Sequence, residues 1–293
     1  MNKIRQSYVF AGLAVLFWST IPTAFKVSLQ QIDILPLLTI ASITSSAVLF
    51  IVVVSGHKAG LIAGATLKEL LTSAVLGFIN PFIYYLILLK AYRLLPAQVA
   101  QPLNMIWPLV LAFLSVPLLG QKIPAKSYAA LFISFAGVYI IASRGHPFDT
   151  GRINLPGVLL ATGSSVFWSF YFIINVRDKR DESVKLLMNF LFGSCYLIIA
   201  LALTGGFHPG SFPLKGIAGS IYIGIFEMGI TFLLWLKALQ TAPSAARISN
   251  LVYLAPFFSL IPVHYILGEP VYYTTPAGLV LIIAGIWIQS RNS

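Results

Sequence analysis

The sequence predicts an all-α integral membrane protein with ten transmembrane helices, arranged as two inverted repeats of five helices. Three observations predict this fold: the composition, ten long windows almost without charged residues, and an internal repeat. Of the 293 residues, 58% are hydrophobic and 9% are charged, whereas soluble domains carry about 25% charged residues. A membrane span takes about 20 apolar residues. We therefore expect the chain to consist of spans and short connections, without a separate soluble domain.

The ten windows follow one another closely along the chain. They are residues 8–25, 34–57, 70–89, 94–121, 127–143, 153–176, 186–208, 216–236, 248–268 and 270–290. Prolines at 96 and 243 support helix ends at the two shortest connections. The first window resembles a secretory signal, but it continues past the usual apolar length of a signal through Trp18 to Pro22. A retained first helix is therefore the better interpretation.

The basic residues predict the orientation. Counted on alternate sides of the windows, thirteen Lys and Arg lie on the side of the N-terminus and six on the other. Cytoplasmic loops hold the excess of basic residues, so we expect a multi-pass protein of the bacterial cytoplasmic (inner) membrane with both termini in the cytoplasm. Because these residues are scattered between apolar runs, the net charge of +11 does not indicate a nucleic-acid partner.

The two halves of the chain resemble each other at a shift of 147 to 150 residues. The matches are Phe17-Trp18-Ser19 with Phe167-Trp168-Ser169, Lys90-Ala91 with Lys237-Ala238, Pro108 with Pro256, Gly120-Gln121 with Gly268-Glu269, and Ala136-Gly137 with Ala284-Gly285. Shared apolar composition explains any one match but not their constant order. Residues 8–143 and 153–290 are the predicted repeats. Since five spans is an odd number, the second copy enters the membrane from the opposite face, an arrangement typical of secondary transporters.

The second copy also carries a local motif. Pro256 is followed by Leu267-Gly268-Glu269 and then by Ala284-Gly285, while the first copy departs from the motif with Leu119-Gly120-Gln121. With the ten spans and the repeat, this pattern resembles the drug/metabolite transporter superfamily, in particular its tandem EamA-domain members. The resemblance implies alternating access and a substrate among amino acids, their analogues, other amphipathic metabolites or toxic compounds, commonly exported. The aromatic-rich spans are most similar to amino-acid exporters of the YddG type.

Polar side chains at membrane depth are the candidate substrate site, because such groups are costly in lipid unless they face protein or water. Glu227 lies near the middle of the eighth span, and its repeat partner Asn80 lies near the middle of the third. Tyr84 follows Asn80 by four residues, which in a regular helix places both side chains on one face. Amide and aromatic groups in other spans complete the predicted cavity lining: Trp18, Asn104, Trp107, Trp168, Tyr171, Asn250 and Tyr253.

Simpler roles exist for these residues. Glu227 and Asn80 could form packing hydrogen bonds between helices, and tryptophans often belong to interfacial belts. In the functional interpretation, Glu227 binds a cationic or amino group or exchanges a proton, and the aromatic side chains hold the apolar part of a small solute.

Other function classes find less support. No Gly-x-x-x-x-Gly-Lys loop is present, which excludes direct ATP drive by this chain. A membrane-embedded enzyme would need a catalytic set that the scattered acid, cysteine and histidines do not supply. A passive channel is an alternative that the sequence does not exclude. With one cysteine, Cys195, no metal or other cofactor is expected. The expected partners are a small-molecule substrate and the lipid bilayer, with a monomer as the functional form and a dimer left open.

Overall fold

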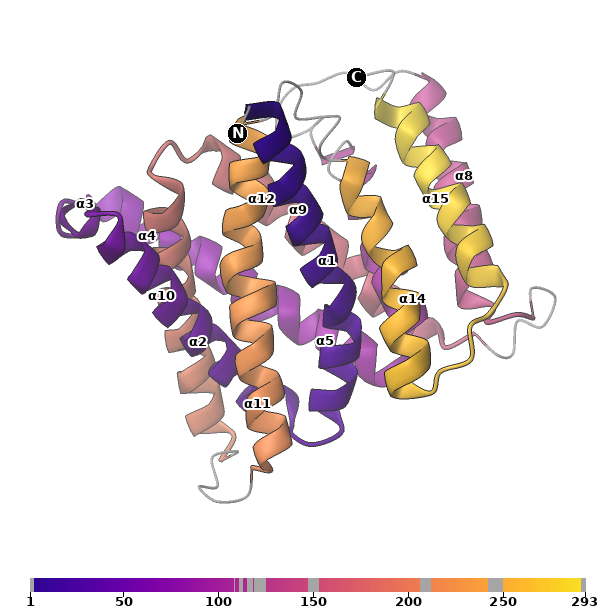
Figure 1. The fold of residues 1–293 in the computed structure, drawn as a ribbon, viewed down its shortest axis with the longest axis horizontal. Coiled ribbons are helices and arrows are strands. Elements are labelled where there is room, and N and C mark those ends of the chain that lie inside the picture. Colours follow the sequence, from indigo (N-terminus) through magenta and orange to yellow (C-terminus); the bar gives the residue numbers. More distant parts are fainter. Residues whose placement is uncertain are drawn as a thin grey trace. The chain divides into compact units, whose positions relative to one another are not determined.

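The computed structural model describes residues 3–107, 109–110, 113–114, 118, 125–146, 153–205, 212–241 and 250–290. Every regular element in these ranges is helical, and no β-strand occurs in them (Figure 1). This agrees with the predicted all-α class. A helix satisfies its backbone hydrogen bonds internally, which a segment inside lipid requires because no water is available there.

The elements keep the labels of Figure 1. They are α1 (Lys3–Leu29), α2 (Ile34–Ser55), α3 (Ala59–Ala63), α4 (Leu67–Gly77), η1 (Phe78–Ile83), α5 (Tyr84–Leu94), α6 (Ala97–Asn104), α8 (Ala125–Ala142), α9 (Leu155–Arg177), α10 (Glu182–Leu203), α11 (Leu214–Ile223), η3 (Gly224–Gly229), α12 (Ile230–Thr241), η4 (Asn250–Tyr253), α14 (Leu254–Leu267) and α15 (Thr274–Ser290).

Within the described ranges, six helices are long and apolar enough to cross a membrane. They are Ile4–Leu29, Ile34–Ser55, Leu67–Leu94, Leu155–Asn175, Glu182–Leu203 and Leu214–Trp235. Three shorter apolar helices fall inside the fifth, ninth and tenth predicted spans, at Phe132–Ala142, Leu251–Leu267 and Thr274–Ile288. The fourth predicted span and the connection at 242–249 lie partly or wholly outside the described residues. A multi-pass membrane protein is supported, and the total of ten spans stays a prediction.

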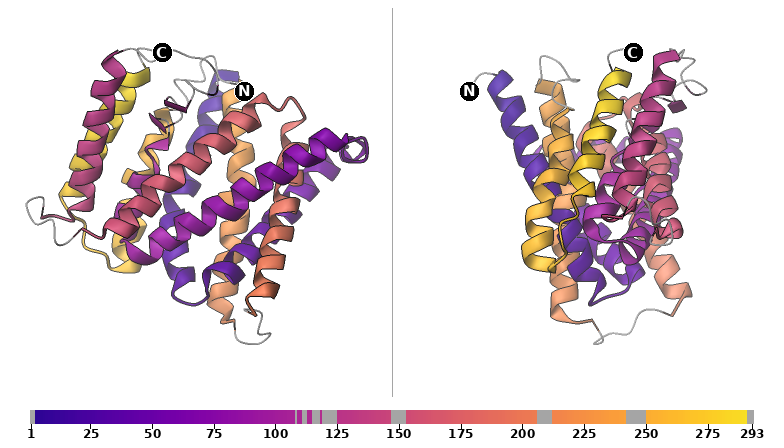
Figure 2. Two further views of the ribbon diagram at one scale, coloured as in Figure 1. Left: turned by 180° about the vertical axis from the view of Figure 1, so that it is seen from behind. Right: turned by 90° about the vertical axis from the view of Figure 1, so that its right-hand side faces the viewer.

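The chain forms two compact units that do not follow the predicted repeats. Unit 1 contains Met1–Leu86 and Arg177–Ser259, and unit 2 contains Ile87–Val176 and Leu260–Ser293. Each unit therefore takes segments from both halves of the sequence. In unit 1, α1 packs along α11 and α12, and α10 packs against α2 and α4, as the views from two further sides also show (Figure 2).

Two spans of unit 1 contain a π-helical segment at matching places. η1 continues α4, and η3 continues α11. Asn80 in η1 leaves helical geometry, with φ −144° and ψ 118°, and the Asn80–Pro81 peptide bond is cis. The hydroxyl of Thr231, in the first turn of α12, donates to the carbonyl of Phe226 in η3, five residues earlier. Such segments occur frequently at functional sites, and here they hold Asn80 and Glu227, the two polar residues that the predicted repeat pairs.

Glycines bring the backbones of unit 1 into close contact where these segments begin, Gly77 directly before η1 and Gly224 as the first residue of η3. A Cβ added at Gly77 would lie 2.3 Å from the carbonyl oxygen of Asn189 and 3.0 Å from the Cβ of Phe192, both in α10. A Cβ added at Gly224 would lie 2.4 Å from the carbonyl oxygen of Ala41 and 2.7 Å from the Cβ of Thr44, both in α2. Small residues at helix interfaces are what such close packing in membranes requires.

In unit 2, α8 and α15 run side by side (Figure 1). Gly137 and Gly278 meet at their crossing, where a Cβ on either would lie 2.6 Å from the other's carbonyl oxygen. Gly268 ends α14 in the left-handed region, with φ 67°, a conformation that glycine adopts without steric cost. The chain then turns so that Glu269 Oε1 accepts the backbone N–H of Ala97 at 3.0 Å, at the start of α6.

Ionic contacts surround the start of α10. Asp181 accepts the backbone N–H groups of Ser183 and Val184 as the N-cap of α10, and it pairs with Lys58 at 2.6 Å. Burial alone would raise the pKa of Asp181, but the hydrogen bonds from Lys58 and Ser183 outweigh it and hold the pKa below its usual value.

The ion pair of Arg180 and Asp178 is more deeply buried than that of Lys58 and Asp181. Arg180 Nη2 lies 2.5 Å from Asp178 Oδ2, and the two side chains are 11% and 8% exposed. Arg180 also donates to the Ser73 hydroxyl of α4 at 2.9 Å. Burial opposes ionisation of Asp178, yet the hydrogen bonds and charge of Arg180 prevail and lower the pKa of Asp178. The loop before α10 is thus tied to α4 by charge-assisted hydrogen bonds, which are the stronger kind.

Candidate functional site

Glu227 is the centre of the candidate site in unit 1. It lies in η3 and is 9% exposed. The hydroxyl of Tyr85 donates to Glu227 Oε1 at 2.9 Å, and the Trp18 side chain lies near the same carboxyl group. Glu227 Oε2 is buried without a hydrogen-bond partner. A buried charged group is stable only when it is paired and hydrogen-bonded, and one oxygen of this carboxyl group lacks such a partner in the described part of the structure.

Aromatic rings surround the two neighbours of Glu227. The ring centroid of Trp18 lies 5.2 Å from that of Trp235 and 6.5 Å from that of Phe232, with the second pair nearly perpendicular. Tyr85 is fully buried, and its centroid lies 6.3 Å from that of Phe25. Edge-to-face pairs at such distances stabilise each other beyond the area they bury. The rings therefore form an aromatic frame next to the carboxyl group.

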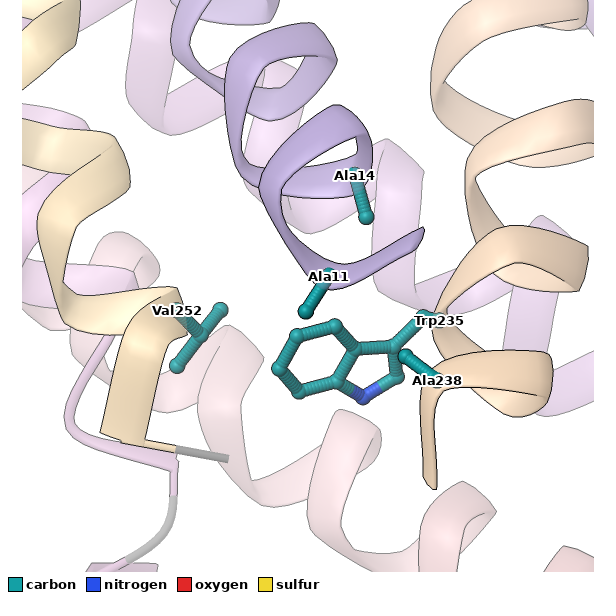
Figure 3. Packing of buried hydrophobic residues seen from close by; sticks show 5 residues of the cluster. All are labelled: Ala11, Ala14, Trp235, Ala238 and Val252. Atoms are coloured by element: carbon teal, nitrogen blue, oxygen red, sulfur yellow. The ribbon is translucent and has the colours of Figure 1, made fainter. Parts of the chain in front are cut away.

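Small side chains make room for Trp235. Figure 3 shows its indole lying among Ala11 and Ala14 of α1, Val252 of η4 and the neighbouring Ala238 of α12. Trp18 and Tyr253 are half-buried and pack against this cluster. Two predicted site residues thus lie in the same aromatic frame.

The predicted common face of Asn80 and Tyr84 needs regular α-helix between the two residues, which the structure does not have. Asn80 is non-helical and the segment from 78 to 83 is π-helical. The residue that reaches Glu227 is Tyr85, while Tyr84 is buried against the Tyr85 ring, with centroids 4.7 Å apart. The helix is kinked at Asn80 and Pro81. Asn80 is fully buried, and neither amide atom has a hydrogen-bond partner.

A second aromatic cluster in unit 2 contains four other predicted residues. The Trp168 centroid lies 6.5 Å from that of Trp107 and 5.7 Å from that of Tyr171. Asn104 Nδ2 donates to the Ser164 hydroxyl at 2.8 Å, so this amide makes the kind of interhelical hydrogen bond that packing alone explains. The three aromatic residues thus pack together through Trp168, and Asn104 lies in the same unit.

The remaining predicted residue is Asn250. It belongs to η4, but its side chain lies outside the described part of the structure. The ten predicted residues are thus divided between the units, and a single cavity lined by all ten stays a prediction. In the described residues no group of three or more His, Cys, Asp or Glu could hold a metal ion.

Sequence reasoning missed Tyr85 and Trp235. Tyr85 stands beside the predicted Tyr84, and the repeat pairs Tyr85 with Phe232 at the shift of 147 that also pairs Asn80 with Glu227. That pairing of two aromatic residues could have identified Tyr85 as a site residue. Trp235 has no aromatic counterpart, since residue 88 is Leu, and only the packing of α12 against α1 brings it to Trp18.

Comparison with known proteins places the chain in a family. The model of the EamA-like transporter family matches residues 5–143 and 155–291. A solved crystal structure superposes with a TM-score of 0.67, covering 98% of this chain and 99% of that one, at 19% sequence identity. At this identity the likeness concerns the fold alone.

Curated relatives are also named transporters. "Uncharacterized transporter YvbV" of Bacillus subtilis is 25% identical over 221 residues, which are 75% of this chain and 71% of that protein. An uncharacterized transporter of Clostridium kluyveri is 26% identical over 99% of this chain and 94% of its own length. "Aromatic amino acid exporter YddG" of Ancylobacter novellus is 26% identical over 79% of each chain. Since the family model matches most of its length, the chain belongs to the EamA-like transporter family of the drug/metabolite transporter superfamily.

Proposed function

We propose that this protein is a secondary transporter that moves small amphipathic metabolites, amino acids or their analogues, out of the cell across the bacterial inner membrane. One observation carries the proposal: the buried Glu227 carboxyl group has one oxygen bonded to Tyr85 and the other without a partner. An ionisable residue at membrane depth is by default a functional group. The carboxyl group binds the amino group of the solute, and the aromatic frame holds its apolar part.

Alternating access between inverted repeats is the proposed mechanism, and the close contacts of unit 1 support it. The contacts of Gly77 with Asn189 and Phe192 correspond to those of Gly224 with Ala41 and Thr44 at shifts of 147 and 148 residues. Each glycine contacts a helix of the other predicted repeat, as a twofold relation between the copies requires. Rocking of one repeat against the other would then expose the site to each side in turn.

The hydroxyl groups of α2 and α10 support the same relation. Ser46 and Ser194 correspond at a shift of 148 residues, and their hydroxyl oxygens lie 3.3 Å apart. Ser42 also bonds Ser194 at 2.8 Å. Equivalent residues of two copies meet in this way only near the axis that relates them. The proposed axis therefore passes between α2 and α10.

The proposed topology has both termini in the cytoplasm. Reporter tags fused to each end of the full chain test this topology. One tag is active only in the cytoplasm and the other only in the periplasm. Both ends should report the cytoplasm. Termini on opposite sides would contradict the even number of spans and the inverted repeats.

Flux into liposomes that contain the purified protein tests the transport proposal. A panel of labelled amino acids, nucleosides, sugars and cationic drugs should show saturable exchange for amine-bearing members. Glu227→Gln, which removes the charge but keeps the shape, should abolish or strongly reduce that exchange and change its pH dependence. Glu69→Gln is the matched control, because Glu69 is a half-buried residue in the first turn of α4 that forms a capping box with Thr66. Steady conductance in a planar bilayer would instead indicate a passive channel.

A further inference from the structure

The turn that carries Glu227 departs from the α-helical hydrogen-bond pattern at the carbonyl group of the preceding residue, Phe226. In an α-helix this carbonyl group would accept the backbone N–H of Ile230, four residues later. Here the N–H of Ile230 donates to the carbonyl group of Ile225, five residues earlier. The carbonyl group of Phe226 accepts from the hydroxyl group of Thr231, which is fully buried in the first turn of α12. A side-chain donor therefore serves the carbonyl group whose α-helical donor is bonded elsewhere.

Close packing on α2 holds both ends of this turn. A Cβ added at Gly224 would lie 2.4 Å from the carbonyl oxygen of Ala41. A Cβ added at Gly229 would lie 3.3 Å from Cγ1 of Val48 and 3.0 Å from the carbonyl oxygen of Gly224. The backbone of η3 thus lies directly against α2, and the glycines at its two ends permit that approach.

The side chain of Phe226 is held by contacts with α1 and α11. Its ring centroid lies 4.9 Å from that of Phe17 and 4.7 Å from that of Tyr222. The hydroxyl group of Tyr222 in turn lies 2.7 Å from that of Thr20, which donates its own proton to the carbonyl group of Phe17. These contacts fix the residues before Glu227, so the direction of the Glu227 side chain depends on the helical register of the turn itself.

We propose that Thr231 is a positioning residue for Glu227: its hydroxyl group stabilises the π-helical turn, and that turn directs the carboxyl group toward Tyr85. This inference rests on the proposed function, which gives Glu227 its role in solute binding. Each residue of an α-helix rotates the side-chain direction by about 100°, and a return of the turn to α-helix would shift the register by one residue. The hydrogen bond from Tyr85 to Glu227 Oε1, 2.9 Å long, would not survive a rotation of that size.

A hydroxyl group that donates to a carbonyl group of the preceding turn is common in helices and needs no positioning role. Thr39 in α2 is such a case, because it is 6% exposed and donates to the carbonyl group of Leu35, four residues earlier, at 2.8 Å. Thr231 differs in two respects. Its acceptor lies five residues earlier, and the N–H that would serve this acceptor in a regular helix is bonded elsewhere. Thr39 is therefore the matched control for Thr231.

A double-mutant cycle between Thr231 and Tyr85 tests the inference. Thr231→Val removes the hydroxyl group and keeps the branched shape, and the Tm of the purified full chain in detergent micelles is followed by tryptophan fluorescence. Tyr85→Phe should lower the Tm of the otherwise unaltered protein by about 3–12 °C. In the Thr231→Val background the same change should lower the Tm by less than about half as much, because the bond between Tyr85 and Glu227 is already lost. A hydroxyl group with only a local structural role would leave the two losses additive.

Three further variants keep the test decisive. Thr231→Ser retains the hydroxyl group and should retain the full effect of Tyr85→Phe, and Thr39→Val should give additive losses with Tyr85→Phe. Thr231→Ala also lacks the hydroxyl group and introduces no larger side chain, so it replaces Thr231→Val in the cycle if that variant does not fold. Additive losses at Thr231, or an equal reduction in the Thr39→Val background, would overturn the inference. The cycle needs no solute, so its outcome is independent of the liposome assay of the proposed function.

Discussion

Replacing Gly77 by alanine tests the close approach of α4 to α10. The new Cβ would lie 2.3 Å from the carbonyl oxygen of Asn189 and 2.8 Å from the backbone nitrogen of Gly193. Real Cβ contacts are essentially never shorter than 3.0 Å, so the helices must separate by about 0.7 Å along this contact. Both obstacles are backbone atoms, so no side chain can rotate away to relieve them.

The expected free-energy change combines two effects. Gly77 has helical angles, φ −65° and ψ −32°, so alanine brings a gain of up to about 1 kcal/mol in helix propensity. Overpacking costs about 1–3 kcal/mol, and a forced backbone movement belongs in the upper part of that range. We therefore expect a net loss of about 1–2 kcal/mol.

Thermal unfolding followed by tryptophan fluorescence measures this loss. One kcal/mol corresponds to about 2–4 °C in Tm for chains of 150–250 residues, so a fall of about 2–8 °C is expected. Gly163→Ala is the matched control, because Gly163 lies inside α9 with no atom within 4 Å of the added Cβ; its Tm should stay the same or rise. Equal Tm values for the two variants would refute the reasoning.

Three further predictions concern single polar contacts. Tyr85→Phe should lower the free energy of unfolding by about 1.5–3 kcal/mol, as for the loss of a hydrogen bond to a charged group. The double variant with Glu227→Gln should lose less stability than the sum of the two single variants. Additive losses in this double-mutant cycle would contradict the hydrogen bond. The lowered pKa of Asp178 stabilises the fold above the unfolded-state pKa of about 3.9; this stability should disappear as the pH falls through the folded-state value. Tm between pH 3 and 7 should depend less on pH in Asp178→Asn, and an unchanged profile would exclude the Arg180 pair as the cause. Glu269→Ala should lower the free energy of unfolding by about 0.5–2 kcal/mol, because a helix cap is lost. Glu269→Gln should lower it less, because the amide oxygen can still accept the hydrogen bond. Equal Tm values for the two variants would show that the cap does not contribute to stability.

The candidate site was only partly predictable from the sequence. Glu227 and Trp18 stand out because charge is rare in the spans and because Phe-Trp-Ser is repeated. Tyr85 was missed because the choice between it and Tyr84 depends on the helical phase, and the non-helical Asn80 changes that phase. A count of residues per turn is valid only along a regular helix.

The sequence by itself determined a helical, multi-pass membrane protein with one acid in its spans, because lipid permits few backbone forms and makes charge costly. Only the tertiary structure decided which helices meet. The tertiary structure takes unit 1 from both halves of the chain and brings Tyr85 to Glu227. The physical reason is that lipid is as apolar as the helix surfaces, so hydropathy does not encode helix partners. Close backbone packing at residues such as Gly77 and Gly224 distinguishes one partner from another.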